Sequence, residues 1–453
     1  ITPQLVADFK DGVYGKNSGL STFDNVLNHV RNGNATMVDA DGLLKWAPHN
    51  LVSYSGDFAN SFWIKAEISV GADATPPPVA GLSVFKLTPA ATFAEHRVAA
   101  ANIMDTDIDH TLSIWVKANG YSSINIGSHR LAPNVTFDLS TVTVTAENGG
   151  AVGTITAAGN DWYKIEVALI VSSFARDDFL MTVTSPSNAS PSHAWTPDGT
   201  SSILIAAPHA YRSDLGGMVN NPATGDSYVP TTDAARYLPR ENHHVYNGSA
   251  WVKEGYLHEP GAATNLVTYS NDFTAASWGS FNAATPVPDA TGPDGISNSA
   301  VTFVDDGGGG LAQVRIALTQ AVSASTTQTF SVFAKADQLS FVNLKVYNFT
   351  TPANGDNYFD LSNGVVSSTD AGFSGAIESL GNGWYRCSVS FTTGATDTTG
   401  NASLQLANAD GNTSVDADGT SSILIYGAQF EEGSGPTSYI PTAGSTVTRA
   451  ADT

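Results

Sequence analysis

A set of short motifs in the first half of the chain returns in its second half, in the same order. The longest identical stretch, Asp-Gly-Thr-Ser-Ser-Ile-Leu-Ile, occupies residues 198–205 and again 418–425. The other matching pairs are residues 50–58 and 265–273, 113–118 and 331–336, 137–140 and 359–362, and 162–164 and 384–386. A period of roughly 215 residues is too long for a solenoid, so the sequence predicts two copies of one domain.

Both copies carry the alternation of apolar and polar residues that is typical of β-strands. Every second residue is apolar in 162–169 and in its counterpart, 384–391. Such stretches recur every ~10–15 residues, between Gly, Asn, Asp and Pro, whereas helical periodicity is nearly absent. The pattern predicts an all-β protein with two tandem antiparallel β-sandwiches of the jelly-roll type.

Short elements are predicted ahead of each sandwich. Residues 36–44 should form a hairpin that turns on Asp41-Gly42, and residues 244–252 one that turns on Asn247-Gly248, because glycine accepts the positive φ of a tight turn. One short helix is predicted over residues 23–30, where apolar residues recur at helical spacing after Ser21 and Thr22 as caps.

These elements divide the chain into five parts. A Tyr-Val-Pro-Thr segment ends the first sandwich and a Tyr-Ile-Pro-Thr segment ends the second. The predicted parts are an N-terminal anchor segment with the helix (1–34), a hairpin plus the first sandwich (35–232), a linker and hairpin (233–264), the second sandwich (265–441) and a C-terminal tail (442–453).

The charge balance limits the partners. A formal net charge of −22 repels the phosphates of nucleic acids and an anionic membrane leaflet, so we expect neither as a ligand. No apolar run approaches the ~18 residues of a membrane-spanning helix, so no membrane insertion is expected. Charged residues are only 14% of the chain, which predicts a surface of Ser, Thr, Asn and Gly. A single cysteine excludes an internal disulfide.

Two features that resemble reactive or phosphate-binding sites are better explained by the fold. Cys387 occupies the position of Ile165 in the other copy, which favours a small core residue over a nucleophile. The four glycines 307–310 lack the lysine of a phosphate-binding loop and are interpreted as a hairpin loop. No cofactor site is indicated, and no Gly-x-Ser-x-Gly nucleophile motif occurs.

Metal-binding interpretations are weak. Asp-Ala-Asp-Gly at Asp39, Asp41 and again at Asp416, Asp418 resembles the start of a calcium loop but lacks its later ligands, so a turn is favoured over a hard-cation site. His243, His244 and His258 are the histidine candidates. Adjacent histidines on a strand point to opposite faces, which favours a surface or linker role.

Acidic residues found in one copy only are Glu95, Glu147, Glu431 and Glu432. Two of them could form the carboxylate pair of a glycoside hydrolase, or all could be solvated surface groups.

Aromatic residues fall into two groups. Those present in both copies are expected to pack the shared framework. Trp46, Tyr121, Trp195 and Trp251 lie outside the shared frame, and an exposed ring stacks on the apolar face of a sugar. These four are the predicted glycan contacts, with a satellite core role as the alternative.

With these residues in place, the chain resembles a family of phage virion proteins, mostly tail-fibre or tail-associated products. The resemblance rests on the hairpin motif 35–42, the Asn-Leu-x-x-Tyr-Ser-x-Asp-Phe motif at 50–58, the linker that precedes the second copy and the closing motif 427–442, followed by Thr-Arg-Ala-Ala-Asp at 448–452. The second copy matches throughout. The first departs at 206–209, where Ala-Ala-Pro-His replaces Tyr-Gly-Ala-Gln.

The resemblance implies a non-enzymatic virion protein whose sandwiches resemble carbohydrate-binding modules. The leading expectation is a tail-fibre or tail-associated adhesin that contacts host surface polysaccharide. A capsid decoration or head-fibre protein with a purely structural role is the alternative, and a glycan depolymerase is a third. The resemblance further implies that the N-terminal segment anchors the chain to other virion proteins and that the chain forms a homo-oligomer.

Overall fold

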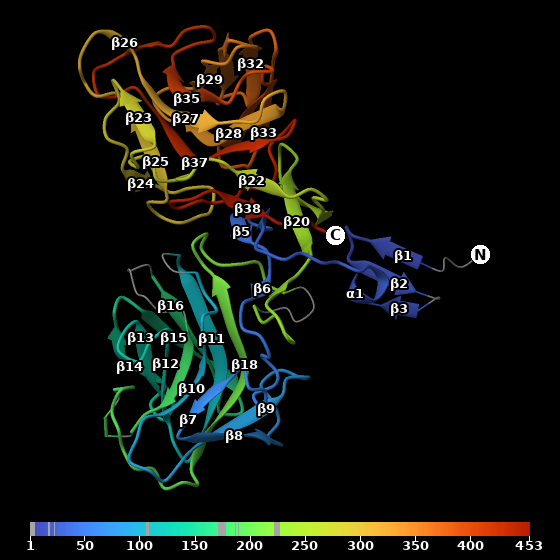
Figure 1. Ribbon diagram of the computed structural model, residues 1–453, viewed down its shortest axis with the longest axis vertical. Helices are drawn as coiled ribbons and strands as arrows, with labels where there is room; N and C mark the ends of the chain where they lie inside the picture. The colour runs from blue at the N-terminus through green and yellow to red at the C-terminus, as the bar shows by residue number, and fades with distance from the viewer. Residues whose placement is uncertain are drawn as a thin grey trace. The chain divides into compact units, whose positions relative to one another are not determined.

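In the part of the chain that the computed structural model describes, the protein consists of β-strands and one short helix (Figure 1). It forms two compact units. The first-sandwich unit is Pro48–Leu238, and the second-sandwich unit combines Ile1–Ala47 with Pro239–Thr453. No helix among the described residues is long and apolar enough to cross a membrane. The described residues are 5–16, 19–21, 23–105, 108–170, 178–185, 187–188, 190–221 and 227–453.

The first-sandwich unit contains two six-stranded antiparallel sheets. One has the order β14 (Thr143–Asn148), β13 (Asn134–Asp138), β12 (Ser123–Gly127), β17 (Phe179–Val183), β10 (His96–Ala100) and β7 (Ile64–Ala66). The other has the order β15 (Val152–Gly159), β16 (Trp162–Leu169), β11 (His110–Asn119), β18 (Ser202–Arg212), β9 (Val84–Pro89) and β8 (Ile68–Asp73). Near the ends of the unit, β6 (His49–Asn50) pairs with β19 (Arg236–Tyr237).

The second-sandwich unit repeats this plan. One sheet has the order β23 (Trp278–Phe281), β27 (Arg315–Ala321), β35 (Thr399–Ala407), β29 (Phe341–Tyr347), β31 (Asn357–Asp360) and β32 (Val365–Thr369), with β30 (Asn354–Gly355) beside β29. The other has the order β24 (Pro288–Ala290), β25 (Ala300–Val304), β37 (Ser422–Glu432), β28 (Thr327–Ala336), β34 (Trp384–Thr392) and β33 (Phe373–Ser379). The predicted fold of two tandem antiparallel sandwiches is confirmed.

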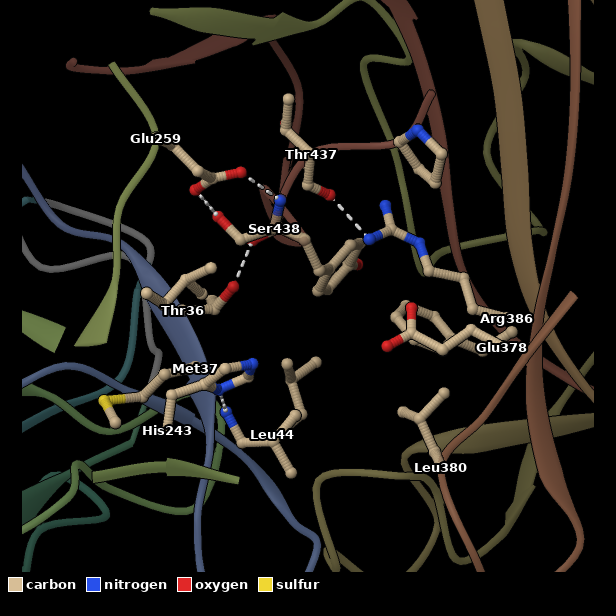
Figure 2. Close-up of a pocket in the computed structure, with 15 residues that line it drawn as sticks. Thr36, Met37, Leu44, His243, Glu259, Glu378, Leu380, Arg386, Thr437 and Ser438 are labelled. Atoms are coloured by element: carbon tan, nitrogen blue, oxygen red, sulfur yellow. Dashed lines mark hydrogen bonds between the residues drawn. The ribbon is translucent and has the colours of Figure 1, made fainter. Parts of the chain in front are cut away.

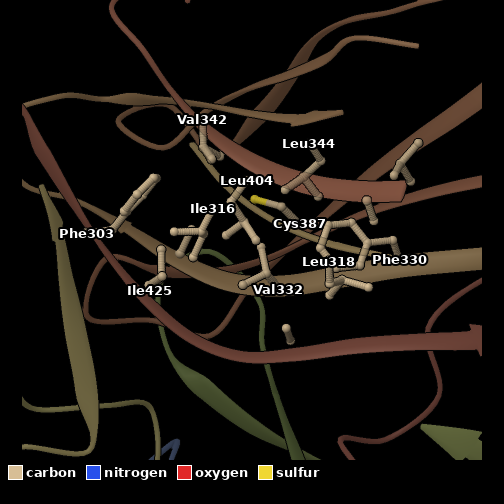
Figure 3. Packing of buried hydrophobic residues seen from close by; sticks show 14 of the residues in the cluster. Phe303, Ile316, Leu318, Phe330, Val332, Val342, Leu344, Cys387, Leu404 and Ile425 are labelled. Carbon is tan, nitrogen blue, oxygen red and sulfur yellow. The ribbon is translucent and has the colours of Figure 1, made fainter. Parts of the chain in front are cut away.

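The two sheets of each sandwich enclose an apolar core. Figure 3 shows part of the second core, where Cys387 lies among Ile316, Val332 and Leu404. Cys387 is fully buried, as Ile165 nearly is in the first core, and burial raises the pKa of its thiol. The prediction that Cys387 is a core residue is therefore confirmed, and its thiol is not activated for nucleophilic attack.

Both predicted hairpins form. In the first, β4 (Thr36–Val38) pairs with β5 (Leu44–Trp46), and Gly42 in the turn has a φ of +79°. In the second, β20 (Arg240–Tyr246) pairs with β21 (Trp251–Leu257), and Gly248 has a φ of +95°. Both hairpins belong to the second-sandwich unit. The first hairpin is bonded to this unit by a hydrogen bond that Leu44 N donates to Pro293 O.

The N-terminal segment forms the sheet β1 (Leu5–Asp8), β2 (Val13–Lys16), β3 (Gly19–Ser21), followed by helix α1 (Phe23–Val26). The helix is shorter than predicted. By Val30 the backbone has turned to exchange hydrogen bonds with Thr453, at 2.7 and 3.0 Å, and those two bonds replace helical ones. The predicted cap Thr22 lies outside the described residues.

Residues 239–264 of the expected linker and the expected tail, 442–453, are integral parts of the second-sandwich unit, whereas residues 233–238 belong to the first-sandwich unit. Here β38 (Val447–Arg449) pairs with β22 (Ala263–Asn265). Arg240, Arg449 and Asp452 are at most 2% exposed. The expected division rested on the Tyr-Val-Pro-Thr and Tyr-Ile-Pro-Thr segments, and it failed because charged residues that follow these segments are buried against each other.

The glycines 307–310 do not form a hairpin turn. They connect β25 to β26 (Leu311–Gln313), and β26 pairs with β36 (Ser414–Asp416) instead of with β25. The buried carboxylate of Asp305 fixes this loop by accepting from Gly307 N at 2.9 Å, Gly419 N at 2.6 Å and Ser421 N at 2.9 Å.

Candidate functional site

Two of the four predicted glycan-contact residues are buried. Trp46, on β5, is 3% exposed, so neither face of its ring can receive a sugar. Tyr121 is 9% exposed, its hydroxyl accepts from Asp198 N at 2.8 Å, and its ring packs edge-on against Trp195 at 5.1 Å. For these two residues the satellite core alternative is the correct one.

Trp195 and Trp251 are half-buried, and they lie in different units. Trp195 exchanges backbone hydrogen bonds with Ala94, and its indole Nε1 is buried without a partner among the described residues. The ring of Trp251 lies against Gly42, because a Cβ atom there would come within 2.0 Å of it. The Trp251 ring therefore covers the backbone of Gly42 on one face.

The aspartates of the predicted turns hold those turns. Asp39 accepts from Asp41 N at 3.0 Å and from Leu43 N at 2.9 Å. Asp418 accepts from the backbone and hydroxyl of Thr420 at 3.0 and 2.6 Å, and Asp416 is exposed on β36. Within the described part of the chain, no three His, Cys, Asp or Glu side chains converge as metal ligands would.

The candidate histidines serve the second hairpin and its surroundings. His243 accepts through Nδ1 from Val38 N at 3.2 Å, which requires a neutral ring, and burial lowers its pKa to about 4. His244 Nδ1 lies 2.7 Å from Asn242 O, and His258 Nδ1 lies 3.1 Å from the hydroxyl of Tyr256.

The four candidate acids do not form a catalytic pair. Glu95 binds Arg97 and Arg130, and Glu147 accepts from Gly153 N at 2.8 Å, both in the first-sandwich unit. In the other unit, the buried Glu431 accepts from Gln429 and twice from Thr437, whereas Glu432 is exposed. A glycosidase needs two carboxyl groups on either side of one bond, whereas Glu95, Glu147 and Glu431 each have separate partners within the protein.

A cavity of about 180 Å³ lies in the second-sandwich unit, between the outer face of β28, β34 and β33 and the two hairpins. Figure 2 shows Arg386 and Glu378 on one side, and Met37, Leu44 and His243 on the other. Thr36, Val38, Leu257, Glu259, Phe333, Leu380, Pro436, Thr437, Ser438 and Tyr439 complete the lining.

Two polar side chains of this cavity, Glu259 and Arg386, are bonded within the protein, and Glu378 is exposed. Glu259 accepts from Ser438 N at 2.8 Å and from its hydroxyl at 2.7 Å (Figure 2). It also pairs with Arg240 at 2.6 Å. Burial alone would raise the pKa of Glu259, but Arg240 and Ser438 hold it below its usual value. Arg386 donates to Thr437 O and to the hydroxyl of Ser331. A carboxylate kept ionised in this way is a poor general acid. We therefore interpret the cavity as a structural joint, the place where the two hairpins pack against the sheet.

The same joint contains a buried ion-pair cluster. Asp452 binds Arg31 at 3.0 Å and Arg240 at 2.5 Å, and all three side chains have no exposed surface. Glu259 links this group to Arg449 at 3.2 Å. The cluster ties the N-terminal segment, the second hairpin and the C-terminus of one unit together.

A second arrangement of polar residues lies on the outer face of a sheet. Strand registers align five side chains across the second sandwich: Phe281 on β23, Arg315 on β27, Gln405 on β35, Asn343 on β29 and Tyr358 on β31. Residues beside them in the strands, including Ile316, Leu404 and Phe359, belong to the core, so these five point away from it. We call this line the second row.

The second row is open at one end and covered at the other. Phe281 is 47% exposed. Among the described residues, Phe281 and Phe93 are the two aromatic residues that are exposed. Tyr358 is 8% exposed, and the loop after β35 crosses above this end, because Asp410 accepts from Ser368 on β32 at 2.5 Å. Burial and nearby carboxylates raise the pKa of Tyr358 to about 12.

The polar groups in the middle of the second row are preorganised. Asn343 donates to Asp356 at 2.7 Å and accepts from Asn357 N at 2.8 Å. Lys345 donates to both oxygens of Asp356 at 2.9 Å. At the open end, the Arg315 guanidinium lies 4.9 Å from the centre of the Phe281 ring. The exposed part of the row is therefore an aromatic ring beside a guanidinium group.

The first sandwich has a corresponding line, the first row. It consists of Ala66 on β7, Arg97 on β10, Thr182 on β17, Asn125 on β12 and Thr136 on β13. Arginine and asparagine occupy the same places in both rows. The buried Asn125 Oδ1 and Thr182 Oγ1 have no partner among the described residues, whereas Asn125 Nδ2 donates to Thr136 at 2.8 Å.

Sequence reasoning missed both rows, although a signal was present. Arg97 and Arg315, like Asn125 and Asn343, are separated by the same interval as the matching segments 113–118 and 331–336. Aromatic residues outside the shared frame were preferred as ligand contacts. Phe281 lies just beyond the repeated motif 265–273 and its Trp278, where no match drew attention to it.

Comparisons with known proteins leave the function open. No family model matches the chain, and no curated protein matches it. Among solved structures, a tandem of two CBM22 domains from Paenibacillus barcinonensis Xyn10C is 12% identical, with a TM-score of 0.26, over 86% of this chain and 98% of that one. Vicilin from Corylus avellana is 7% identical, with a TM-score of 0.11, over 79% and 88% of the two chains. Scores at this level establish neither a shared fold nor a shared function.

Proposed function

We propose that this chain is a non-enzymatic, glycan-binding virion protein, a tail-fibre or tail-associated adhesin whose second sandwich contacts host surface polysaccharide. The observation that carries the glycan-binding part is the open end of the second row. There an exposed phenyl ring lies beside a guanidinium group on a rigid sheet, at the edge of a hydrogen-bonded line of amides. A sugar ring can stack its apolar face on an aromatic ring, and its hydroxyl groups can bond to fixed polar groups of the protein.

The virion part of the proposal rests on the sequence motifs alone. The sparsely charged surface suits adhesion in variable salt, because little of the binding would depend on screened charge. A homo-oligomer is part of the same proposal, and light scattering on the purified chain measures it.

The test is binding of the purified chain to an array of bacterial surface polysaccharides and to intact cells. Replacing Phe281 by Ala should weaken binding by up to about tenfold, because fully burying a phenyl ring contributes roughly 1.5–3 kcal/mol, Phe281 has only 47% left to bury, and 1.4 kcal/mol is tenfold. Leu311→Ala is the matched control, since Leu311 is 76% exposed in the same sandwich but lies outside the row. Failure of the chain to bind any polysaccharide or cell would refute the adhesin role.

A second candidate function is a decoration or head-fibre protein with a structural role. It is favoured by the N-terminal sheet, which exposes Leu5 (55%), Val13 (42%) and Leu20 (89%). Exposed apolar residues near a chain end suit docking to another protein. In this case Val13→Ser with Leu20→Ser should prevent incorporation into particles and leave polysaccharide binding unchanged. Incorporation at normal levels would remove the support for N-terminal docking.

A further inference from the structure

The arginine of the second row has no acidic partner. Its guanidinium contacts the Phe281 ring, and no carboxylate among the described residues pairs with it. Arg97, at the same place in the first row, is neutralised by Glu95, which also binds Arg130 at 3.4 Å. Each sandwich thus presents one arginine at the same position, and only the second presents it with its charge uncompensated.

The surroundings of Arg315 do not supply the missing charge. Its neighbours along the row, Gln405 and Asn343, are neutral. Asp356, which accepts from Asn343 of the row, is already paired with Lys345.

A carboxylate is the ligand group that fits this arginine. The guanidinium offers a planar fork of N–H donors that matches both oxygens of a carboxylate. The ring beside it offers an apolar surface of the size of a pyranose face. A sugar that carries a carboxyl group would use both contacts at once, whereas a neutral sugar would leave the charge of Arg315 unmatched.

We propose that the second row recognises an acidic glycan, a polysaccharide that contains a uronic acid or another carboxyl-bearing sugar, with the carboxylate on Arg315 and the sugar ring on Phe281. This inference rests on the proposed glycan-binding function and narrows it to a substrate class. It also assigns the site to one of the two sandwiches.

The experiment uses the full chain and an array of acidic and neutral bacterial polysaccharides. Each polysaccharide that binds is then reduced at its carboxyl groups to the neutral form and measured again. We expect binding to fall at least tenfold on reduction, because the neutral form leaves the guanidinium of Arg315 without a carboxylate partner. Arg315→Gln should cause a similar loss on the acidic form and no further loss on the reduced form.

Matched variants separate this role from a structural one. Arg97→Gln changes the same residue type at the same place in the first row and should leave binding unchanged. Arg315→Lys keeps the charge but loses the fork, and its affinity should fall between those of the wild type and Arg315→Gln. Calorimetric melting curves verify that each variant is folded.

The outcomes distinguish the acidic-glycan inference from the proposed glycan-binding function. Binding that survives carboxyl reduction and the loss of Arg315 would overturn the acidic-glycan inference and leave glycan binding in place. Binding that Arg97→Gln abolishes would move the site to the first sandwich and overturn the assignment. Absence of binding to every polysaccharide would overturn both.

Discussion

The two sandwiches are copies with the same strands and the same arginine and asparagine in their rows, but they differ in what surrounds these residues. In the first row the arginine is paired with Glu95, and the outermost position is Ala66. In the second row the arginine is unpaired, and the outermost position is the exposed ring of Phe281. The shared fold places a row of polar residues across one sheet of each sandwich. The residues beside the row determine whether its outer end can bind a ligand.

The units also differ in the interactions that hold their ends in place. In the second-sandwich unit, Asp452 near the C-terminus is buried between Arg31 and Arg240. In the first-sandwich unit, the two-residue strands β6 and β19 pair near the ends of the unit, and its Arg212–Asp214 pair is local and partly exposed. Buried ion pairs are costly to break, so the largest differences between the units should appear when these ties are altered.

The largest expected effect is on the stability of the second-sandwich unit. Asp452→Asn removes the charge between Arg31 and Arg240 and leaves two buried guanidinium groups facing each other, which should cost about 3–5 kcal/mol. Asp214→Asn is the control in the first-sandwich unit. Because Asp214 is partly exposed, it should cost less than about 1 kcal/mol. Urea denaturation measures the free energy of unfolding of both variants. Equal losses would mean that the buried ion pairs of Asp452 stabilise the protein no more than the partly exposed pair of Asp214.

The same tie predicts a loss of stability in acid. Burial alone would raise the pKa of Asp452, but Arg240 and Arg31 outweigh it and lower that pKa to about 2. An acid with a lowered pKa stabilises the fold above its unfolded pKa of about 3.9, and this contribution is lost as the pH falls towards about 2. About 2 kcal/mol should disappear over this interval in the wild type. In Asp452→Asn the stability should fall less steeply over this interval, because Glu259 and other acids still contribute. A profile parallel to that of the wild type would show that other groups are responsible for the whole loss.

Much of the fold could be predicted from the sequence because its signals are local. Alternating apolar residues predicted the strands, and Asp41-Gly42 and Asn247-Gly248 predicted both hairpins. The tie at Asp452 could not be predicted, because its partners are Arg31 and Arg240, far away in sequence, and no local pattern indicates that a charged residue will be buried.

The candidate site was less predictable than the fold. Exposure decides whether a ring can bind a sugar, and strand register decides which residues adjoin it. Trp46 was selected for its residue type and turned out to be buried. Phe281 and Arg315 adjoin only through the pairing of β23 with β27, which neither strand's own sequence specifies.

An intermediate effect should separate the two asparagines. Asn343 accepts from the buried Asn357 N and donates to Asp356, so Asn343→Ala should cost about 1–3 kcal/mol through the unsatisfied backbone group. Asn125 has an Oδ1 atom with no partner among the described residues, so Asn125→Ala removes fewer hydrogen bonds and should cost less. Denaturation of the two variants measures the difference. A larger loss for Asn125→Ala would mean that the first row is the more tightly bonded one.

The smallest effect on stability, and the most direct test of the comparison, comes from converting one row into the other. Glu95→Gln frees Arg97, and Ala66→Phe adds a ring at the position that corresponds to Phe281. Because the ion pair is partly exposed, stability should change by less than about 1 kcal/mol. With an acidic polysaccharide fragment, calorimetry should then show two binding sites per chain in place of one. A stoichiometry that stays at one would show that charge and ring are insufficient, and that the preorganised Asn343–Asp356–Lys345 group of the second row is also required.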